Sequence, residues 1–388
     1  MPIHAVIDLG FGDGGKGVAV DNIAFGCDTT PLVIRFSGGQ QCGHAVMPDA
    51  DTKHVFSSFG SGTFCGAPTF FTKDTTFYPS AIINEWCKMP HKTRNGVDSR
   101  SLMIHPLAML TTPYDIAYNR MKEAVHTKHG SCGLGVGATS KRCIETPYKT
   151  FAQDLSYPAL LEQKLERVKG YYLDLIRATS SDHDRYYEML NAFKYYLGDG
   201  ALEEIFLKDI YLRDTSLPFS VSDVDVNAYS NIIFEGSQGI MLDMDHGIFP
   251  NVTYANTTSK NAFRFCKERG LRITDIHYVT RCYTTRHGEG WMPNETPIEL
   301  INTKEEINVK NDWQGGFRIS EIDYDMLNYA LGIDAAYHDS QYNVNKHLRV
   351  SCLDQRPDFI LNKEKLQTEQ FIQVLGGYSP MRGNMKRI

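Results

Sequence analysis

The chain has 388 residues, of which 42% are hydrophobic and 22% charged, a composition typical of a folded globular protein and not of a disordered or fibrous one. Forty basic and 46 acidic residues give a net charge of −6, so no overall cationic field exists to hold nucleic acid or an anionic membrane. An anionic ligand must therefore be met by a local site.

The nine cysteines are scattered along the chain and contain no Cys-x-x-Cys pair, which argues against a disulfide framework and against a structural zinc site. No apolar run approaches the ~20 residues of a membrane span, and the first four residues lack the basic and apolar regions of a signal peptide. We expect a cytoplasmic protein in a reducing compartment.

Short apolar runs that end at glycine-rich stretches alternate with amphipathic stretches along the chain. The predicted strands lie at residues 4–9, 31–36, 231–234 and 276–279, and the predicted helices at residues 80–88, 157–179, 185–197 and 325–331. This alternation predicts an α/β fold with a mostly parallel central sheet flanked by helices, in which ligands bind at the carboxyl ends of the strands. No repeat or linker composition interrupts the chain, so we expect a single domain over residues 1–388 with a helical insertion at about residues 151–230.

The first strand leads into a glycine-rich loop at residues 10–17, which reads Gly-Phe-Gly-Asp-Gly-Gly-Lys-Gly. The loop fits the G-x-x-x-x-G-K pattern of phosphate-binding loops, but Gly17 stands where such a loop needs Ser or Thr for magnesium. Backbone N–H groups, the Lys16 ammonium and the N-terminus of the next helix can together hold phosphate oxygens. The sequence predicts a P-loop-like phosphate site at a strand end. The alternative is a tight strand-to-helix turn with a solvated lysine.

A second glycine loop follows the second strand and reads Ser-Gly-Gly-Gln-Gln-Cys-Gly-His over residues 37–44. An imidazole is the side chain best suited to proton transfer near neutral pH. A lone histidine is more often structural than catalytic, but parallel strands bring their loops to one edge. His44 is therefore expected to face Asp13 of the first loop.

These two loops resemble those of the adenylosuccinate synthetase family, which typically read G-D-E-G-K-G and R-x-x-G-G-x-N-A-G-H. The resemblance continues through ordered motifs over most of the chain: Gly130-Ser131-Cys132-Gly133-Leu134-Gly135, Phe234-Glu235-Gly236-Ser237-Gln238-Gly239, Leu242-Asp243-Met244-Asp245-His246-Gly247, Pro250-Asn251-Val252-Thr253, and Thr284-Thr285-Arg286 with Gly288 and Gly290, which is similar to S-T-R-V-G-x-G.

The resemblance implies a ligase that joins the amino group of L-aspartate to C6 of a 6-oxopurine nucleotide, driven by a nucleoside triphosphate. In this family the purine O6 is first phosphorylated, and the amine then displaces phosphate. Asp13 would take the N1 proton, Lys16 would assist, and His44 would act around O6 and the transferring phosphoryl group. Mg²⁺ would be held by Asp13 and the carbonyl of Gly43.

The same resemblance implies the remaining site residues. The triphosphate would be bound by Gly12, Gly15, Lys16, Gly17, Gly43 and His44 and its base by Asp354; the acceptor nucleotide by Asp13, Gln41, Ser131, Cys132, Gln238 and Thr253; and the aspartate by Arg318. Family members are homodimers in which a basic residue reaches the partner's nucleotide phosphate, a role that would fall to Arg142 or Lys141.

Departures from the family patterns bear on the substrates. The loop T-T-G-R-R-R-R is here Gln314-Gly315-Gly316-Phe317-Arg318, and the guanine motif T-K-x-D is Ser351-Cys352-Leu353-Asp354, so the donor is expected to be ATP or GTP with little preference. Gly14 replaces a glutamate, Gln41 an asparagine and Cys132 a threonine. Space at Gly14 and an acceptor at Gln41 would suit the 2-amino group of guanine.

We therefore favour dGMP as acceptor, as in the phage branch of the family that serves diaminopurine genomes, in which case the compartment is the host cytoplasm. The housekeeping reaction with IMP is the alternative, and retained Asp13 supports it. Two readings from other classes remain: a P-loop-type phosphotransferase, and a catalytically dead nucleotide-binding relative. Retention of Asp13, Lys16 and His44 together argues against the last.

Overall fold

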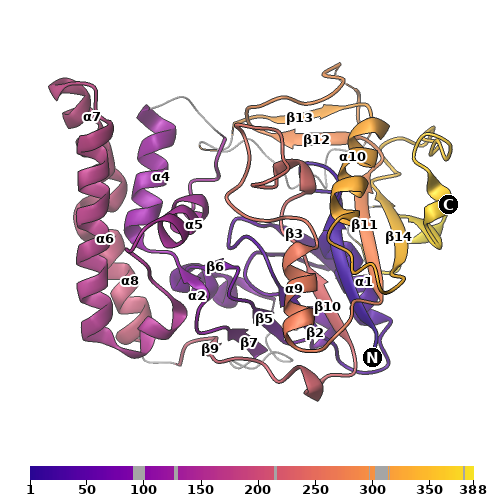
Figure 1. The fold of residues 1–388 in the computed structure, drawn as a ribbon, viewed down its shortest axis with the longest axis horizontal. Helices are drawn as coiled ribbons and strands as arrows, with labels where there is room; N and C mark the ends of the chain where they lie inside the picture. Colours follow the sequence, from indigo (N-terminus) through magenta and orange to yellow (C-terminus); the bar gives the residue numbers. More distant parts are fainter. Residues whose placement is uncertain are drawn as a thin grey trace.

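A large, mostly parallel sheet forms the centre of the computed structural model, which describes residues 1–90, 101–125, 130–213, 216–296, 298–301, 313, 315–378 and 381–388 (Figure 1). Within these residues the spatial order of its ten strands is β16 (Lys386–Arg387), β15 (Gln373–Gly376), β14 (Asn345–Ser351), β11 (Asp275–Arg281), β1 (Ile3–Asp8), β10 (Ile232–Glu235), β2 (Leu32–Arg35), β5 (Thr69–Phe71), β7 (Leu102–Ile104) and β9 (Ser220–Val221). All neighbours pair in parallel except β15 and β16. The predicted α/β fold with a mostly parallel sheet is confirmed.

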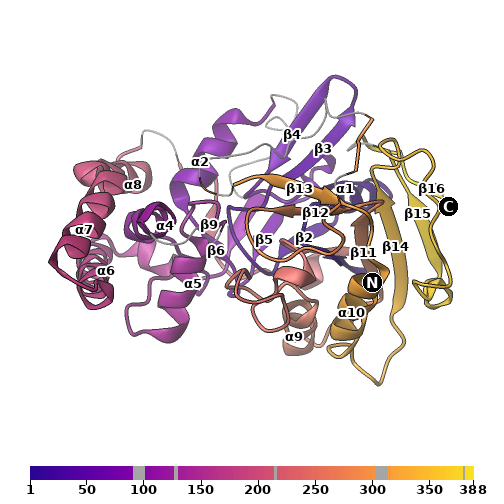
Figure 2. The same cartoon turned by 90° about the horizontal axis from the view of Figure 1, so that it is seen from above.

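The four predicted strands are β1, β2, β10 and β11, and they lie side by side in the middle of the sheet. Val6 packs with α1 (Lys16–Phe25) on one face, whereas Ile7 belongs to the apolar cluster that contains α9 (Lys260–Glu268) and α10 (Tyr324–Ala335). Figure 2 shows α1 on one side of these strands and α9 and α10 on the other. Burial on both faces explains why these strands are continuous apolar runs in the sequence.

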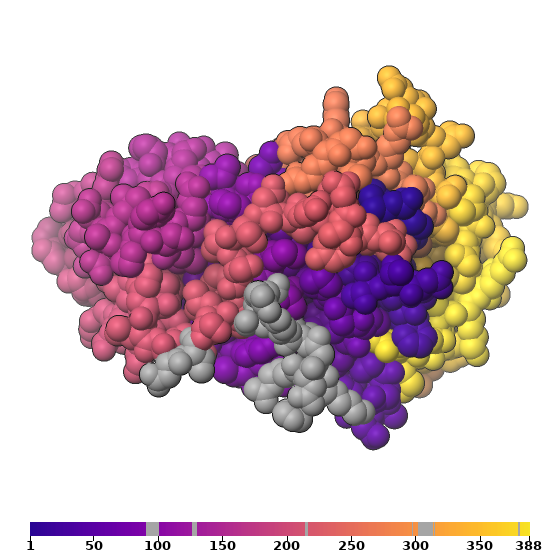
Figure 3. Space-filling view, turned by 90° about the horizontal axis from the view of Figure 1, so that it is seen from below, coloured from indigo at the N-terminus to yellow at the C-terminus, as the bar shows by residue number. Residues whose placement is uncertain are grey.

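The predicted helices correspond to α2 (Pro79–Lys88), α6 (Pro158–Thr179), α7 (His183–Leu197) and α10, and the structure adds α4 (Pro113–Val125), α5 (Val136–Glu145), α8 (Ala201–Tyr211) and α9. Helices α4 to α8 gather beyond one end of the sheet and both termini lie at the other end (Figure 1). In Figure 3 the magenta residues of the middle of the chain lie at one end of the molecule and the yellow C-terminal residues at the other. Helix α6 turns Leu161, Leu165 and Val168 inward at helical spacing. None of the helices in the described part of the chain is long and apolar enough to cross a membrane.

Smaller strand pairs project from the carboxyl edge of the sheet. They are the hairpins β3 (His44–Asp49) with β4 (Thr52–Phe56) and β12 (Thr284–His287) with β13 (Phe317–Ser320), and the parallel pair β6 (Thr76–Phe77) with β8 (Met109–Leu110). Since β3 begins at His44 and β12 ends at His287, each hairpin carries an imidazole to the edge where the loops meet.

A row of histidine side chains crosses β1, β11 and β14 near the amino ends of these strands. Arg349 Nε donates to His277 Nδ1 at 3.1 Å, and His277 Nε2 lies 3.1 Å from His4 Nδ1. The His277 and His347 rings stack at 4.4 Å, and His347 Nε2 is 2.8 Å from an Asp275 oxygen. Burial and then the charge of Arg349 hold the pKa of His277 well below its usual value.

This arrangement predicts that acid destabilises the fold before its carboxylates titrate. The unfolded chain protonates His277 below pH ~6.5 while the folded chain does not, so stability present above that pH is lost as the pH falls. We expect the free energy of unfolding to drop between pH 7.5 and pH 5.5, with on the order of 1 kcal/mol of the drop due to His277. Denaturant titrations at pH 7.5 and pH 5.5 measure this change in the free energy of unfolding.

The His277→Gln variant should show a smaller pH dependence than the wild type, whatever its stability at pH 7.5. Replacement of His183, whose side chain is 81% exposed in α7, is the matched control and should leave the dependence unchanged. An identical pH dependence in wild type and His277→Gln would refute the assignment.

Candidate active site

A cavity of about 1260 Å³ lies where the loops after β1, β2, β10, β11 and β14 face α4, α5 and α6. Single small-molecule pockets usually enclose roughly 300–1,000 Å³, so more than one ligand fits here. The structure brings almost all of the predicted site residues to this cavity; those that line it are Gly12, Asp13, Gly15, Lys16, Gly17, Gln41, Gly43, His44, Ser131, Cys132, Lys141, Arg142, Gln238, Thr253 and Asp354. Arg318 is absent from the lining.

The first loop is shaped by a carboxylate that sequence reasoning missed. Asp8, the last residue of β1, is 2% exposed and accepts from Gly10 N at 2.9 Å, Gly14 N at 2.7 Å and Lys16 Nζ at 3.0 Å. One buried charge thus closes the loop at both ends and neutralises the lysine that begins α1. The sequence feature that could have identified Asp8 is an acidic residue just before a glycine-rich loop.

Asp13 is the residue of this loop that presents an acid to the cavity. Its backbone is left-handed, with φ 63°, which aspartate tolerates better than most residues, and Arg281 Nε donates to its carbonyl at 2.7 Å. Its Oδ2 lies 3.2 Å from His287 Nε2. Burial alone would raise the pKa of Asp13, but the His287 hydrogen bond and the charges of Arg281 and Lys16 lower it to about 2. Asp13 is therefore ionised at neutral pH.

His44 enters the cavity backed by a second buried carboxylate. Its Nδ1 lies 2.5 Å from Oε1 of Glu235, the last residue of β10, which also accepts from the Ser61 hydroxyl and, at 3.0 Å, from Ser61 N. Burial would raise the pKa of Glu235, but His44, Arg35 and Ser61 lower it to about 2, whereas burial lowers the pKa of His44. At neutral pH an ionised Glu235 thus holds the proton of a neutral His44 on Nδ1, and Nε2 is left for a ligand.

The packing of this hairpin explains the unusual glycine of the first loop. A Cβ on Gly17 would lie 2.9 Å from His44 Cβ and 3.1 Å from the Ala45 carbonyl. The Ser or Thr of a standard P-loop therefore cannot occupy this position, which counts against the phosphotransferase alternative.

Gly14 does not supply the space at the purine that the sequence suggested. A Cβ there would lie 2.8 Å from Asp8 Oδ2 and 3.1 Å from the Val279 carbonyl, and Gly14 is not among the residues that line the cavity. A glycine is needed at this position because the loop approaches Asp8 closely. The expectation that Gly14 leaves space for the purine is therefore wrong.

The side-chain amides of Gln41, in the second glycine loop, and Gln238, in the loop after β10, pair at the cavity wall. Gln41 Nε2 donates to Gln238 Oε1 at 3.4 Å, and Gln238 has a left-handed backbone with φ 54°. Among the described residues, the buried Oε1 of Gln41 has no hydrogen-bond partner. The cavity therefore contains an acceptor that a ligand N–H can use.

The wall across from the glycine loops is built by α4, α5 and the turn before α5. The Ser131 hydroxyl accepts from Asn119 at 2.8 Å, and burial raises the pKa of the Cys132 thiol to about 11, so it is a neutral lining group. Lys122 and Lys141 also line the cavity, and neither has an ion-pair partner among the described residues. Burial and, next, the charge of Lys141 lower the pKa of Lys122, as expected for two cations that lie close together.

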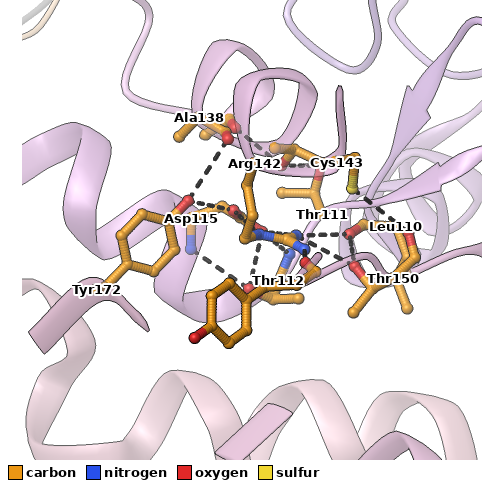
Figure 4. A network of polar contacts seen from close by, with 12 residues as sticks. Leu110, Thr111, Thr112, Asp115, Ala138, Arg142, Cys143, Thr150 and Tyr172 are labelled. Carbon is orange, nitrogen blue, oxygen red and sulfur yellow. Dashed lines mark hydrogen bonds and ion pairs between the residues drawn. The ribbon is translucent and has the colours of Figure 1, made fainter. Parts of the chain in front are cut away.

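Arg142 cannot reach a partner subunit, which corrects that expectation. Its guanidinium is fully buried within one chain, where Nε and Nη2 bind Asp115 at 2.8 and 2.7 Å and Nη1 donates to the Tyr148 carbonyl at 2.5 Å (Figure 4). Asp115 also accepts from Tyr172 at 2.6 Å and from Thr112. This network fastens α5 to α4 and α6, and Lys141 is the basic residue of the pair that stays exposed.

Arg318 is likewise not placed to hold a substrate carboxylate. Its Nη1 pairs with Glu295 at 2.9 Å and its Nη2 donates to the Gly290 carbonyl at 2.6 Å, outside the cavity lining. Arg286 lines the cavity instead, and its nitrogens donate to three backbone carbonyls, with no carboxylate partner among the described residues. Burial lowers the pKa of Arg286 to about 10. Gln314, the other end of the predicted motif, lies outside the described residues.

Residues 351–355 close the end of the cavity beyond the first loop. The Ser351 hydroxyl donates to the Gly14 carbonyl at 3.0 Å, Cys352 has φ 60°, and the buried Oδ1 of Asp354 has no partner among the described residues. Asp354 thus adds an unpaired acceptor to the cavity lining, with Cys352 where the family pattern has a lysine.

Oxygen ligands suited to Mg²⁺ are present at the glycine loops. Asp13 is ionised, and Gly43 reaches the same cavity. A separate group, Asp243, Asp245 and His246, has ligand atoms within 4.8 Å of one another, but Asp243 accepts from Thr257 and Asp245 pairs with Lys260 at 2.9 Å. Two carboxylates of that group are therefore already engaged by residues of the fold.

Comparisons with known proteins identify relatives of the chain. The family model described as adenylosuccinate synthetase matches residues 5–334. The adenylosuccinate synthetases of Thermobifida fusca and Vesicomyosocius okutanii are each 30% identical to the chain over 306 and 312 residues, which cover 77% of it. The matched parts cover 66% and 65% of those relatives, so the chain spans just under two thirds of their length.

Two solved structures share the fold. The fully ligated adenylosuccinate synthetase from Plasmodium falciparum has a TM-score of 0.65 at 17% identity and covers all of both chains. The cyanophage S-2L succinoaminodeoxyadenylate synthetase, bound to dGMP and to dATP as an energy donor, has a TM-score of 0.61 at 14% identity, with 100% of this chain and 95% of that chain covered.

Glu235→Gln tests whether a buried carboxylate sets the tautomer of His44. A neutral amide leaves Arg35 uncompensated and accepts less strongly, so we expect the free energy of unfolding to fall by about 1–3 kcal/mol. Nitrogen NMR of the imidazole should report Nδ1–H in the wild type and a mixture of tautomers in the variant.

Glu85→Gln is the matched control, because Glu85 is also buried and accepts from backbone N–H groups of Ser57 and Ser58 outside the cavity. It should lower stability without changing the His44 spectrum. A His44 tautomer that is the same in wild type and Glu235→Gln would overturn the role of Glu235.

Proposed function

Because the chain belongs to the adenylosuccinate synthetase family, we propose that it is a carbon–nitrogen ligase that condenses L-aspartate with C6 of a 6-oxopurine nucleotide at the expense of a nucleoside triphosphate. The observation that carries the proposal is the meeting of Asp13, Lys16 and His44 in one cavity, with the acid ionised and the imidazole backed by Glu235. The family match and the fold of its solved relatives support it.

In the first step, Asp13 accepts the N1 proton of the purine, and the electron pair moves through the ring to O6. O6 then bonds to the γ-phosphorus of the triphosphate as the bond to the leaving diphosphate breaks. His44 Nε2 lies beside the same loops and is placed to hydrogen-bond O6 or the transferring group. Asp13 and the Gly43 carbonyl would hold Mg²⁺, which would neutralise charge on the triphosphate.

In the second step, the neutral amine of aspartate bonds to C6 as the C6–O6 bond breaks. Phosphate leaves with the former O6, and the proton lost by the amine passes to the departing phosphate. Arg286 has a buried positive charge without a carboxylate partner among the described residues, and we assign it to a carboxylate of aspartate in place of Arg318. For the acceptor phosphate we assign Ser131, Lys122 and Lys141 of the same chain. A homodimer, as in the family, remains part of the proposal.

For the acceptor base we propose a 2-aminopurine nucleotide, dGMP, with IMP as the alternative. Guanine differs from hypoxanthine by a 2-amino group next to N1, and that group needs an acceptor when buried. Gln41 Oε1 is a buried acceptor without a partner on the wall near Asp13. The cyanophage relative of the same fold is described with dGMP, whereas the curated relatives and the retained Asp13 favour IMP.

A competition between IMP and dGMP at equal concentration, with aspartate and ATP, tests the acceptor. We expect the 2-amino deoxy product to predominate, and Gln41→Leu to reduce its share by about 10-fold or more, since one lost hydrogen bond to a buried N–H costs ~1–3 kcal/mol. Gln153→Leu, at an exposed position, is the control. Predominant adenylosuccinate from the wild type would assign the chain to the housekeeping reaction.

Donor selectivity follows from Asp354 and the missing lysine. A carboxylate accepts from guanine N1–H and N2–H or from adenine N6–H, so we expect the kcat/KM values for ATP and GTP to differ by less than about 100-fold, ~2.7 kcal/mol. Asp354→Asn should weaken GTP more than ATP, because guanine offers this residue only donors. The exposed Asp358→Asn is the matched control. A GTP preference beyond 100-fold in the wild type would contradict the assignment.

A further inference from the structure

His287 lies at the end of β12, directly over the first glycine loop. Thr285 is two residues away on the same face of the strand, and its hydroxyl donates to the Gly12 carbonyl at 3.5 Å, which holds the hairpin against the loop. Phe317, opposite in β13, packs on the imidazole with ring centroids 4.9 Å apart. His287 Nε2 is thereby placed 3.2 Å from Asp13 Oδ2.

The Asp13 carboxylate has one side-chain partner among the described residues, and it is His287. Lys16, the nearest ammonium along the loop, is engaged by Asp8 at 3.0 Å, and Arg281 donates to the backbone carbonyl of Asp13 and not to its side chain. The backbone of Asp13 is therefore fixed by Arg281, and the plane of its carboxylate is fixed by His287.

Asp13 needs a contact of this kind because little else restrains the orientation of its carboxylate plane. The terminal torsion of aspartate is broad, so a carboxylate held only through its backbone samples many orientations. A hydrogen bond from Nε2–H to Oδ2 selects one plane and leaves Oδ1 without a side-chain partner among the described residues. In the sequence pattern S-T-R-V-G-x-G the corresponding position is a valine, which has no donor, so this restraint belongs to the present chain.

We propose that His287 is a positioning residue that holds Asp13 with Oδ1 presented to the N1 proton of the acceptor purine. This inference rests on the proposed function. In the step concerned the N1–H bond breaks and an Oδ1–H bond forms, the electron pair passes to O6, and O6 bonds to the γ-phosphorus as the diphosphate leaves. His287 keeps its own proton on Nε2 throughout and touches no reacting atom.

Correct orientation acts on the chemical step and not on triphosphate binding. We expect His287→Val to lower kcat by about 10- to 100-fold while the KM for the triphosphate changes less than about 3-fold. His287→Gln retains an N–H donor of similar reach and should keep at least about one third of the wild-type kcat. His54→Val is the matched control, since His54 also lies beside a carboxylate, Glu85 at 3.6 Å, but outside the cavity lining.

Two kinetic results would overturn the proposal: a His287→Val enzyme with more than about a third of the wild-type kcat, or a His287→Gln enzyme as slow as His287→Val. Either would mean that the donor to Oδ2 does not determine the rate.

A double-mutant cycle on unfolding tests the contact without relying on activity. The denaturant midpoint is measured for wild type, His287→Val, Asp13→Ala and the double variant. We expect the shift caused by His287→Val to differ between the wild-type and Asp13→Ala backgrounds, and equal shifts would overturn the contact. Wild-type protein that ligates aspartate to none of IMP, GMP and dGMP would refute the proposed function and the role in N1 proton removal, whereas the cycle would still decide whether His287 holds Asp13.

Discussion

The buried carboxylate of Asp8 is the interaction on which the site depends. It accepts from two backbone N–H groups of the first glycine loop and from Lys16, so it fixes the path of the chain from the end of β1 to the start of α1. A carboxylate this deeply buried needs these donors, because an unpaired charge there would cost several kcal/mol. The loop that results gives Asp13 its left-handed backbone and turns its side chain to the cavity.

Carboxylates that are paired with another side chain recur along the carboxyl edge of the sheet. Asp8 ends β1 and is paired with Lys16 at the end of the loop that follows it, and Glu235 ends β10 and is paired with His44 from the loop after β2. Asp13 is paired with His287 in the same way. Asp8 and Glu235 are thus satisfied by internal partners. On the other walls of the cavity, Lys122 and Lys141 have no ion-pair partner and Arg286 has no carboxylate partner among the described residues. A protein with a net charge of −6 thus has a local cluster of cations in its cavity that suits anionic ligands.

Sequence reasoning succeeded where a local pattern carries the information. Four apolar runs predicted the centre of the sheet, because strands covered on both faces must be apolar throughout. The glycine loops placed Asp13 and His44 correctly at the edge. Sequence reasoning failed where a contact depends on how the chain folds back on itself. Arg142 was expected to reach a partner subunit, but α4 brings Asp115 against it, and Gly14 was expected to leave space, but Asp8 and the Val279 carbonyl lie against it. Glu235 and His287 could be recognised only once the strands and hairpins were assembled.

Transfer of the purine O6 to phosphate is the central chemical claim, and an isotope label follows it directly. The acceptor nucleotide is prepared with ¹⁸O at O6 and incubated with aspartate, the nucleoside triphosphate and the wild-type protein, and the inorganic phosphate is examined by mass spectrometry. Phosphorylation of O6 followed by displacement predicts one ¹⁸O in the phosphate for each molecule of ligated product. Ligated product accompanied by phosphate without the label would contradict it.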